Sequence, residues 1–109
     1  MALETISCGE LSASIDPAGA QLMNLKVADA EYLWQGDPDF WPRRAPVLFP
    51  CVGCLKGDAS MSAQGPVHLK RHGIARLYDH KVVSNDGKKV VFELTSNEKT
   101  KEAYPFDFK

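Results

Sequence analysis

The chain has 109 residues, of which 44% are hydrophobic and 25% charged, a composition typical of one globular domain that buries a core. Thirteen basic and 14 acidic side chains give a formal net charge of -1. Because nucleic-acid binding normally shows a basic excess, we expect no nucleic-acid partner. The chain opens with no signal segment and holds no apolar run long enough to span a bilayer, so we expect a cytoplasmic protein with reduced thiols and no membrane partner.

Apolar and polar residues alternate in the first part of the chain, in LETISC (3–8), LSASID (11–16) and QLMNLKV (21–27). A period of two is typical of half-buried strands. Residues 16–19 (DPAG) predict a turn between the second and third strands, because Pro presets φ and Gly accepts a positive φ. EYLW (31–34) predicts a further short strand.

The middle of the chain is less regular. GDPDFWPRRAP (36–46) predicts one helical turn through Phe40 and Trp41, since Asp37-Pro38 offers an N-cap followed by an N1 proline. Prolines bracket residues 47–49, which we expect to be a short or edge strand at best. Residues 57–66 are small and polar and predict a loop.

Alternation returns in VHLKRHG (67–73) and LYDHKVV (77–83), and NDG (85–87) predicts a hairpin turn before a strand in 88–96. NEKTKEA (97–103) fits a helical turn or a charged loop, and the tail from residue 103 fits the beginning of a strand. About eight short strands with no long amphipathic helix predict an all-β fold, an antiparallel β-sandwich.

Cys51, Cys54, His68 and His72 have the spacing C-x2-C-x13-H-x3-H, which lies in the range of Cys2His2 zinc sites. The interpretation is weak, because we expect both histidines on one strand, roughly 13 Å apart at about 3.3 Å per residue. A zinc site at Cys51 and Cys54 with His68 or His72 is therefore a minor alternative. A thioredoxin-type redox pair is also disfavoured, because that chemistry uses a helix N-terminus. We expect two packed or partly exposed thiols.

Five motifs follow one another in the chain, namely YLWQGDPDFW, RRAPVLFPCVG, LKRHGIAR, FELTSNEKT and YPFDF. In this order they resemble the aldose 1-epimerase (galactose mutarotase) family, in particular its LacX-like branch. The resemblance covers essentially the whole chain, but family members are considerably longer, so the chain looks like an N-terminal portion. It implies a single mutarotase-like domain over residues 1–109, a truncated β-sandwich of the galactose-mutarotase type that holds a sugar on a concave sheet without a cofactor or metal.

The resemblance implies no catalytic residue in this chain. Mutarotation needs a base for the anomeric hydroxyl and an acid for the ring oxygen. In the family these are a glutamate and a histidine from segments later than YPFDF, and no residue here matches them. We expect the chain not to catalyse mutarotation alone. An aldose 1-epimerase that is active as an assembled or longer chain is an open alternative.

Three binding residues follow from the resemblance. His72 and Arg76 match the histidine and the arginine of the family's HG-x-x-R segment, and Arg44 matches an arginine near the sugar. The expected partner is an aldohexose or a related sugar. For His72 the alternative is a turn histidine that bonds the backbone, and for Arg44 and Arg76 it is a solvated surface arginine.

The chain departs from the family at Cys54, where the family commonly has the arginine of FP-x-V-G-Arg. The exchange removes a bidentate partner and puts recognition of a sugar phosphate in doubt. A truncated sandwich also exposes strand edges, so we expect a homo-oligomer that assembles through them. A protein-interaction module that self-associates is a further open alternative.

Overall fold

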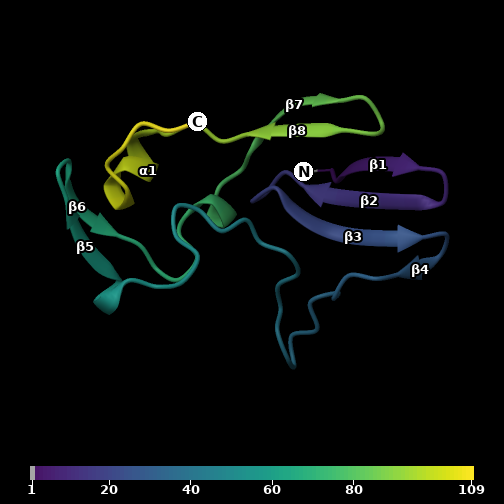
Figure 1. The fold of residues 1–109 in the computed structure, drawn as a ribbon, viewed down its shortest axis with the longest axis horizontal. Helices are drawn as coiled ribbons and strands as arrows, with labels where there is room; N and C mark the ends of the chain where they lie inside the picture. Colours follow the sequence, from purple (N-terminus) through teal and green to yellow (C-terminus); the bar gives the residue numbers. More distant parts are fainter. Residues whose placement is uncertain (1) are drawn as a thin grey trace.

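A four-stranded antiparallel sheet is formed by residues 4–31 in the computed structural model, which describes residues 2–109 (Figure 1). Its strands, in spatial order, are β1 (Glu4–Cys8), β2 (Leu11–Asp16), β3 (Gln21–Val27) and β4 (Ala30–Glu31). The first three confirm the predicted ranges within one residue. The strand predicted over 31–34 is wrong beyond Glu31, whose carboxylate accepts the backbone N–H of Leu33 at 3.3 Å in place of a strand partner.

The predicted turn at residues 16–19 is present and docks onto a distant segment. The carboxylate of Asp16 accepts the N–H of Ala18 at 2.9 Å, which closes the turn locally. Gly19 then donates its N–H to the carbonyl of Tyr78 at 2.8 Å, and His80 donates to the carbonyl of Pro17 at 2.8 Å. The β2–β3 hairpin is thereby fixed against residues 78–80.

The segment between β4 and residue 55 contains turns and single bridges but no regular strand. The predicted helical turn is present, since the N–H of Trp41 reaches the carbonyl of Asp37 at 2.9 Å. The edge strand predicted over 47–49 reduces to one parallel bridge between Phe49 and Gly73.

A hairpin of β5 (Ala59–Ser62) and β6 (Gly65–His68) follows a 3-10 helix at Lys56–Asp58. The loop predicted over 57–66 is therefore wrong. Small polar residues hid the strands, because the turn is closed by side-chain bonds: the Ser62 hydroxyl donates to the Gly65 carbonyl at 2.8 Å and accepts the N–H of Gln64 at 3.2 Å.

The strand predicted over 67–73 ends at His68, and a turn follows. His72 and Gly73 have φ values of 71° and 72°, in the left-handed region that a strand cannot contain. A 3-10 helix spans Ala75–Leu77, and the strand predicted over 77–83 begins only at Lys81. The expected placement of His68 and His72 on one strand is therefore wrong.

The last hairpin of the described residues consists of β7 (Lys81–Asn85) and β8 (Val90–Glu93), which confirms the turn predicted at residues 85–87. It lies beside the first sheet (Figure 1). Ser7 of β1 donates its N–H to the carbonyl of Gly87 at 2.8 Å, and the Asn85 amide donates to the carbonyl of Thr5 at 3.3 Å. These bonds join β1 to the turn between β7 and β8.

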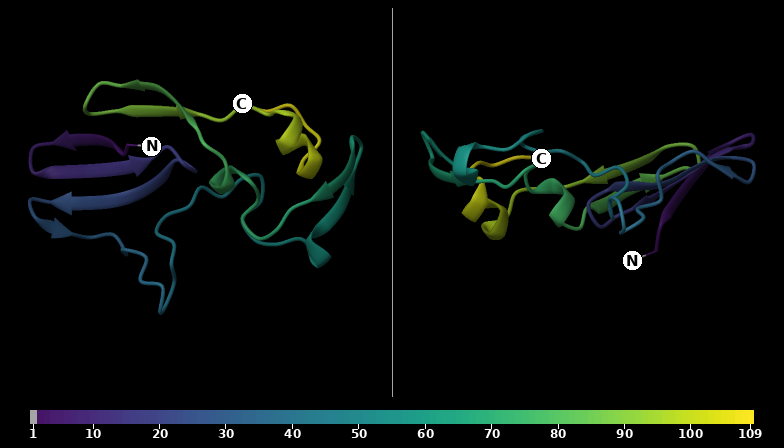
Figure 2. Two further views of the ribbon diagram at one scale, coloured as in Figure 1. Left: turned by 180° about the vertical axis from the view of Figure 1, so that it is seen from behind. Right: turned by 90° about the horizontal axis from the view of Figure 1, so that it is seen from below.

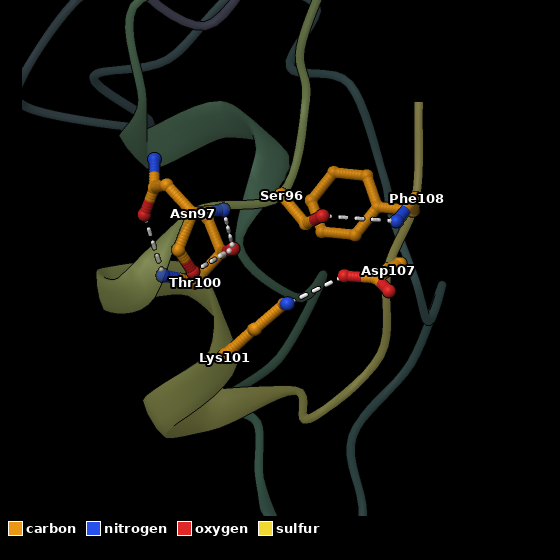
Figure 3. Close-up of polar contacts among 6 residues, drawn as sticks. All are labelled: Ser96, Asn97, Thr100, Lys101, Asp107 and Phe108. Carbon is orange, nitrogen blue, oxygen red and sulfur yellow. Dashed lines mark hydrogen bonds and ion pairs between the residues drawn. The ribbon is translucent and has the colours of Figure 1, made fainter.

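Helix α1 (Glu98–Ala103) resolves the choice between helix and loop in 97–103. Its capping box joins Asn97 and Thr100: the Asn97 side chain accepts the Thr100 N–H at 2.9 Å, and the Thr100 hydroxyl accepts the Asn97 N–H at 2.8 Å (Figure 3). The tail forms no strand within the described residues. It returns to Ser96, whose side chain accepts the N–H of Phe108 at 3.1 Å.

The largest core cluster lies between β6, the turn after it and the C-terminal segment. Val67, Leu69 and Ile74 are buried, and partly buried hydrophobic residues of the C-terminal segment pack on them. The molecule is thin, with extents of 49 × 34 × 19 Å (Figure 2). Its radius of gyration is 16.0 Å, against roughly 13 Å for a compact domain of about 100 residues. Much apolar surface is therefore open.

The antiparallel strands confirm the all-β class. None of the helices in residues 2–109 has the length and apolar character needed to cross a membrane.

Candidate functional site

The candidate site is built where the segment around Phe49 meets the turn that contains His72 and Gly73. The carbonyl of Phe49 accepts the N–H groups of Ile74 at 2.8 Å and Ala75 at 3.2 Å, and the Phe49 N–H reaches the His72 carbonyl at 3.3 Å. The sequence permits this approach because Gly73 has no Cβ. The LFP and HGIAR motifs thus form one structural unit.

His72 is held from two sides by the loop at residues 51–54. Its backbone N–H donates to the carbonyl of Gly53 at 3.0 Å, and its ring Nδ1 contacts the carbonyl of Val52. A carbonyl oxygen can only accept, so Nδ1 carries the proton. In the neutral ring Nε2 is then an acceptor, free to receive a hydrogen bond from a hydroxyl group.

Arg76 lies four residues further on, in the 3-10 helix. Its Nη2 donates to the carbonyl of Arg71 at 3.2 Å, whereas its Nε is buried and has no hydrogen-bond partner among residues 2–109. Burial lowers the pKa of the Arg76 guanidinium, and the positive charge of Arg43 lowers it further. A desolvated donor without a partner is costly in a folded protein and often marks a site of function.

A groove of about 610 Å³ runs along this side of the molecule, between the turn, β6 and α1. Its polar lining is mostly cationic, with one carboxylate. The lining includes His68, Lys70, Arg76, Tyr78, Lys99 and Glu102. His72 is not among the lining residues; it lies beside Gly73, which lines the groove, in the turn before the 3-10 helix of Arg76.

Arg44 is placed differently. Its Nη1 donates to the carbonyl of Met23 at 2.7 Å and to the side chain of Gln35 at 2.9 Å, and its own N–H is bound by Gln21 at 3.0 Å. Within residues 2–109 it makes no hydrogen bond to His72 or Arg76. His72 and Arg76 therefore lie four residues apart, in the turn and in the 3-10 helix that follows it, whereas Arg44 is fixed against β3.

Sequence reasoning missed Arg43, the neighbour whose charge acts on Arg76. One signal could have found it. Adjacent residues of an extended chain project to opposite sides, so only one arginine of the RR pair can direct its side chain toward β3.

The zinc alternative gains no support. Residues 2–109 contain no group of three or more His, Cys, Asp or Glu side chains that could hold a metal ion. His72 uses Nδ1 for Val52, and Cys54 accepts a hydrogen bond from Nη2 of Arg71 at 3.4 Å.

Comparison with known proteins gives a consistent family. The model of the family described as aldose 1-epimerase matches residues 3–109. Protein LacX, plasmid, from Lactococcus lactis subsp. lactis is 31% identical over 104 residues, which are 90% of this chain and 35% of that protein. The chromosomal Protein LacX of the same organism gives the same figures. The chain thus spans about a third of the length of these relatives.

Solved structures agree. A galactose mutarotase related enzyme from Lactobacillus acidophilus superposes with a TM-score of 0.93 at 38% identity, over 97% of this chain and 36% of that one. A galactose mutarotase-like protein from Lactobacillus casei gives 0.91 at 33% identity, over 97% and 37%. The fold is of the galactose-mutarotase type, represented by about a third of it.

Proposed function

Because the chain belongs to the aldose 1-epimerase family, we propose that it binds an aldohexose or a related sugar through His72 and Arg76. Arg44 is a third proposed contact, through Nη2 and Nε, since its Nη1 is occupied. We propose further that these 109 residues do not catalyse mutarotation by themselves.

The unpartnered Nε of Arg76 is the observation that carries the proposal. Arg76 lines the groove, and a shift of its side chain that opens Nε would let a sugar hydroxyl accept from this nitrogen and return the hydrogen bond that burial removed. His72, four residues earlier, offers an acceptor at Nε2 for a hydrogen bond from a second hydroxyl. One donor and one acceptor suit the alternating donor and acceptor character of a sugar diol.

Catalysis needs more than these two groups. A base must take the anomeric proton while an acid protonates the ring oxygen, so that the ring can open and close on the other face. His72 and Arg76 are proposed as binding residues, and no glutamate or histidine here matches the family's acid and base. Sugar binding without mutarotation is therefore the expected behaviour of this chain.

Titration with D-galactose or D-glucose, followed by amide chemical shifts, tests the binding. Saturable shifts at residues 72–76 are expected with a dissociation constant in the millimolar range, on the order of -4 kcal/mol. His72→Asn keeps a donor for Val52 and removes the Nε2 acceptor, so it should weaken binding. His80→Asn is the matched control, because His80 also bonds a backbone carbonyl, that of Tyr78 at 3.0 Å. No shifts up to tens of millimolar sugar would contradict the proposal.

The alternative is an active aldose 1-epimerase in which a longer or second chain supplies the acid and base. Polarimetry of freshly dissolved α-D-glucose distinguishes the two. Acceleration above the buffer rate by purified protein, lost on dilution, would favour the assembled enzyme, whereas an unchanged rate with sugar binding intact supports the proposal.

Self-association is favoured by a separate observation. Many large apolar side chains are exposed, among them Tyr32 at 69%, Phe40 at 79% and Met61 at 73%. Exposed apolar surface and open strand edges promote pairing with a second copy. Light scattering at micromolar concentration should show an oligomer that Met61→Lys on β5 weakens and His72→Ala leaves unchanged. A strictly monomeric profile would contradict it.

A further inference from the structure

The loop at residues 51–54 carries two cysteines that the proposed sugar site does not use. Both thiols are free; Cys54 is exposed and Cys51 is partly buried. Two residues separate them, and residues 51–55 belong to no helix or strand. A third free cysteine, Cys8, is exposed on β1 and serves as an internal comparison.

Arg71 distinguishes Cys54 from Cys8. Its Nη2 lies 3.4 Å from Sγ of Cys54. The ion pairs among residues 2–109 are Lys101 with Asp107 and Lys109 with Glu93, so no carboxylate of the described chain neutralises this guanidinium. A free guanidinium attracts the sulfur when it is ionised, and the thiolate is the form that attacks a disulfide.

Cys51 is placed to act second. Its Sγ lies 3.6 Å from the carbonyl oxygen of Gly53 and 3.9 Å from that of Lys70, and Cys51 packs against the buried Val67, Leu69 and Ile74. A partly buried thiol reacts more slowly with a bulky reagent than an exposed one. Cys51 lies three residues from Cys54 in a loop that is neither helix nor strand, a spacing at which two thiols can join.

We propose that Cys51 and Cys54 form a reversible disulfide by exchange with a low-molecular-weight disulfide of the glutathione class. The Cys54 thiolate attacks one sulfur of glutathione disulfide, an S–S bond to the protein forms, and one glutathione leaves as thiolate. The Cys51 thiolate then attacks Sγ of Cys54 and expels the second glutathione. Two protein thiols are oxidised, one glutathione disulfide is reduced to two glutathiones, and the two thiol protons pass to solvent and the leaving thiolates.

Ring closure acts on the backbone that holds His72. The residues between the two cysteines are Val52 and Gly53, and their carbonyls accept from the ring and the N–H of His72. Forming the S–S bond requires a Cα separation of about 4.4–6.8 Å. The backbone of Val52 and Gly53 then becomes part of the new ring, and their carbonyl groups are expected to shift with it. Oxidation of the thiols is therefore expected to be reported by the resonances of His72.

Intact-mass spectrometry during incubation with glutathione disulfide tests the proposal. In the intact protein we expect a short-lived adduct of one glutathione and then a product that has lost two hydrogens between Cys51 and Cys54. Cys51→Ser should stop at the adduct on Cys54. Cys54→Ser should leave Cys51 reacting no faster than Cys8. A Cys8→Ser background removes scrambling.

Arg71 has its own matched pair. Arg71→Gln should slow the first step about tenfold, and Arg71→Lys should restore most of the rate, because it restores the charge without the planar fork. Amide spectra of each variant check that it is folded, and reduction with dithiothreitol should return the His72 resonances to their starting positions. The proposal is overturned if Cys54 reacts no faster than Cys8 in the folded intact protein, or if the adduct accumulates while Cys51 is present.

Discussion

The carbonyl oxygen of Phe49 occupies the space in which any side chain at residue 73 would begin. A Cβ built on Gly73 falls 2.1 Å from that oxygen, and the atom opposing it is rigid backbone. The same oxygen binds the N–H groups of Ile74 and Ala75. The turn that presents His72 and Arg76 therefore depends on the absence of one methyl group.

Gly73→Ala should lower the free energy of unfolding by about 3 kcal/mol or more, because overlap with backbone adds to the strain of a positive φ. Urea denaturation measures the loss. Gly9→Ala is the matched control: its φ is 59° and open space surrounds it, so it reports backbone strain alone, about 1–2 kcal/mol. Equal losses in the two variants would show that the Phe49 contact is unimportant.

Thr100 should be needed for its hydroxyl more than for its size. It is fully buried, its Oγ1 accepts the Asn97 N–H and donates to the Asn97 carbonyl, and Figure 3 shows it at the centre of this cap. Thr100→Val keeps the shape of the side chain but leaves the Asn97 N–H without a hydrogen-bond acceptor, which should lower the free energy of unfolding by about 1–3 kcal/mol. Thr100→Ser keeps the hydroxyl and should retain most of the stability in the same urea experiment.

Arg76→Met should separate stability from binding. The substitution removes a desolvated guanidinium whose Nε has no partner, which favours folding, and also the bond from Nη2 to the Arg71 carbonyl, which opposes it, so the free energy of unfolding should change by less than ~1 kcal/mol. Sugar-induced amide shifts should disappear. A large loss of stability together with retained binding would mean that Arg76 is structural.

Arg44→Met should behave in the opposite way. Its guanidinium joins β3 to Gln35 through two hydrogen bonds, and removing it leaves the Met23 carbonyl without that donor. We expect a loss of about 1–3 kcal/mol in thermal or urea unfolding. Sugar affinity should fall less than in Arg76→Met, and an equal fall would show that Arg44 binds the sugar directly.

Glu31 should contribute to acid sensitivity. A hydrogen bond from Asn24 is the largest cause that lowers the pKa of its carboxyl below the ordinary 4.5, and the N–H groups of Leu25, Leu33 and Tyr32 add to the effect. The unfolded chain therefore takes up the proton at a higher pH than the folded one. The stability that Glu31 contributes is complete above about pH 4.5 and is lost as the pH falls through the lower folded value.

Glu31→Gln should flatten the acid limb of a plot of unfolding free energy against pH and lower its neutral plateau. Glu10→Gln is the control, because the Glu10 side chain makes no hydrogen bond or ion pair within residues 2–109. Parallel curves for the intact protein and Glu31→Gln below pH 4.5 would refute the assignment.

Local chemistry made much of the fold predictable. Alternation in residues 4–27 located three strands, and the turn signal at 85–87 located a hairpin, because both depend on neighbours in the chain. The β5–β6 hairpin was missed because Ala59, Ser60 and Ser62 carry little strand preference, and its turn is closed by one serine hydroxyl. In such segments, hydrogen bonds of particular side chains, and not residue preferences, determine whether a strand forms.

The placement of the proposed site residues depends on both local and distant contacts. His72 and Arg76 share one motif, and the structure places them four residues apart, in a turn and in the 3-10 helix that follows it. Arg44 and Arg43 are adjacent, and only the packing of Gln21 and Gln35 against Arg44 decides which of them turns toward β3. No sequence rule contains that choice. The left-handed backbone at His72 also ends the strand predicted over residues 67–73, although the alternation of apolar and polar residues continues through that position.

The turn at residues 16–19, which docks on residues 78–80, has a consequence for the order of folding. Gly19 and Tyr78 lie about sixty positions apart, and closing so long a loop is entropically costly before its contacts reward it. The carbonyl oxygen of Arg76 lies 2.7 Å from the position that a Cβ at Gly19 would occupy. The Arg76 backbone is therefore enclosed by the β2–β3 turn only after this loop has closed. The hairpins can form early and independently, and the arginine proposed to grip the sugar reaches its place among the last.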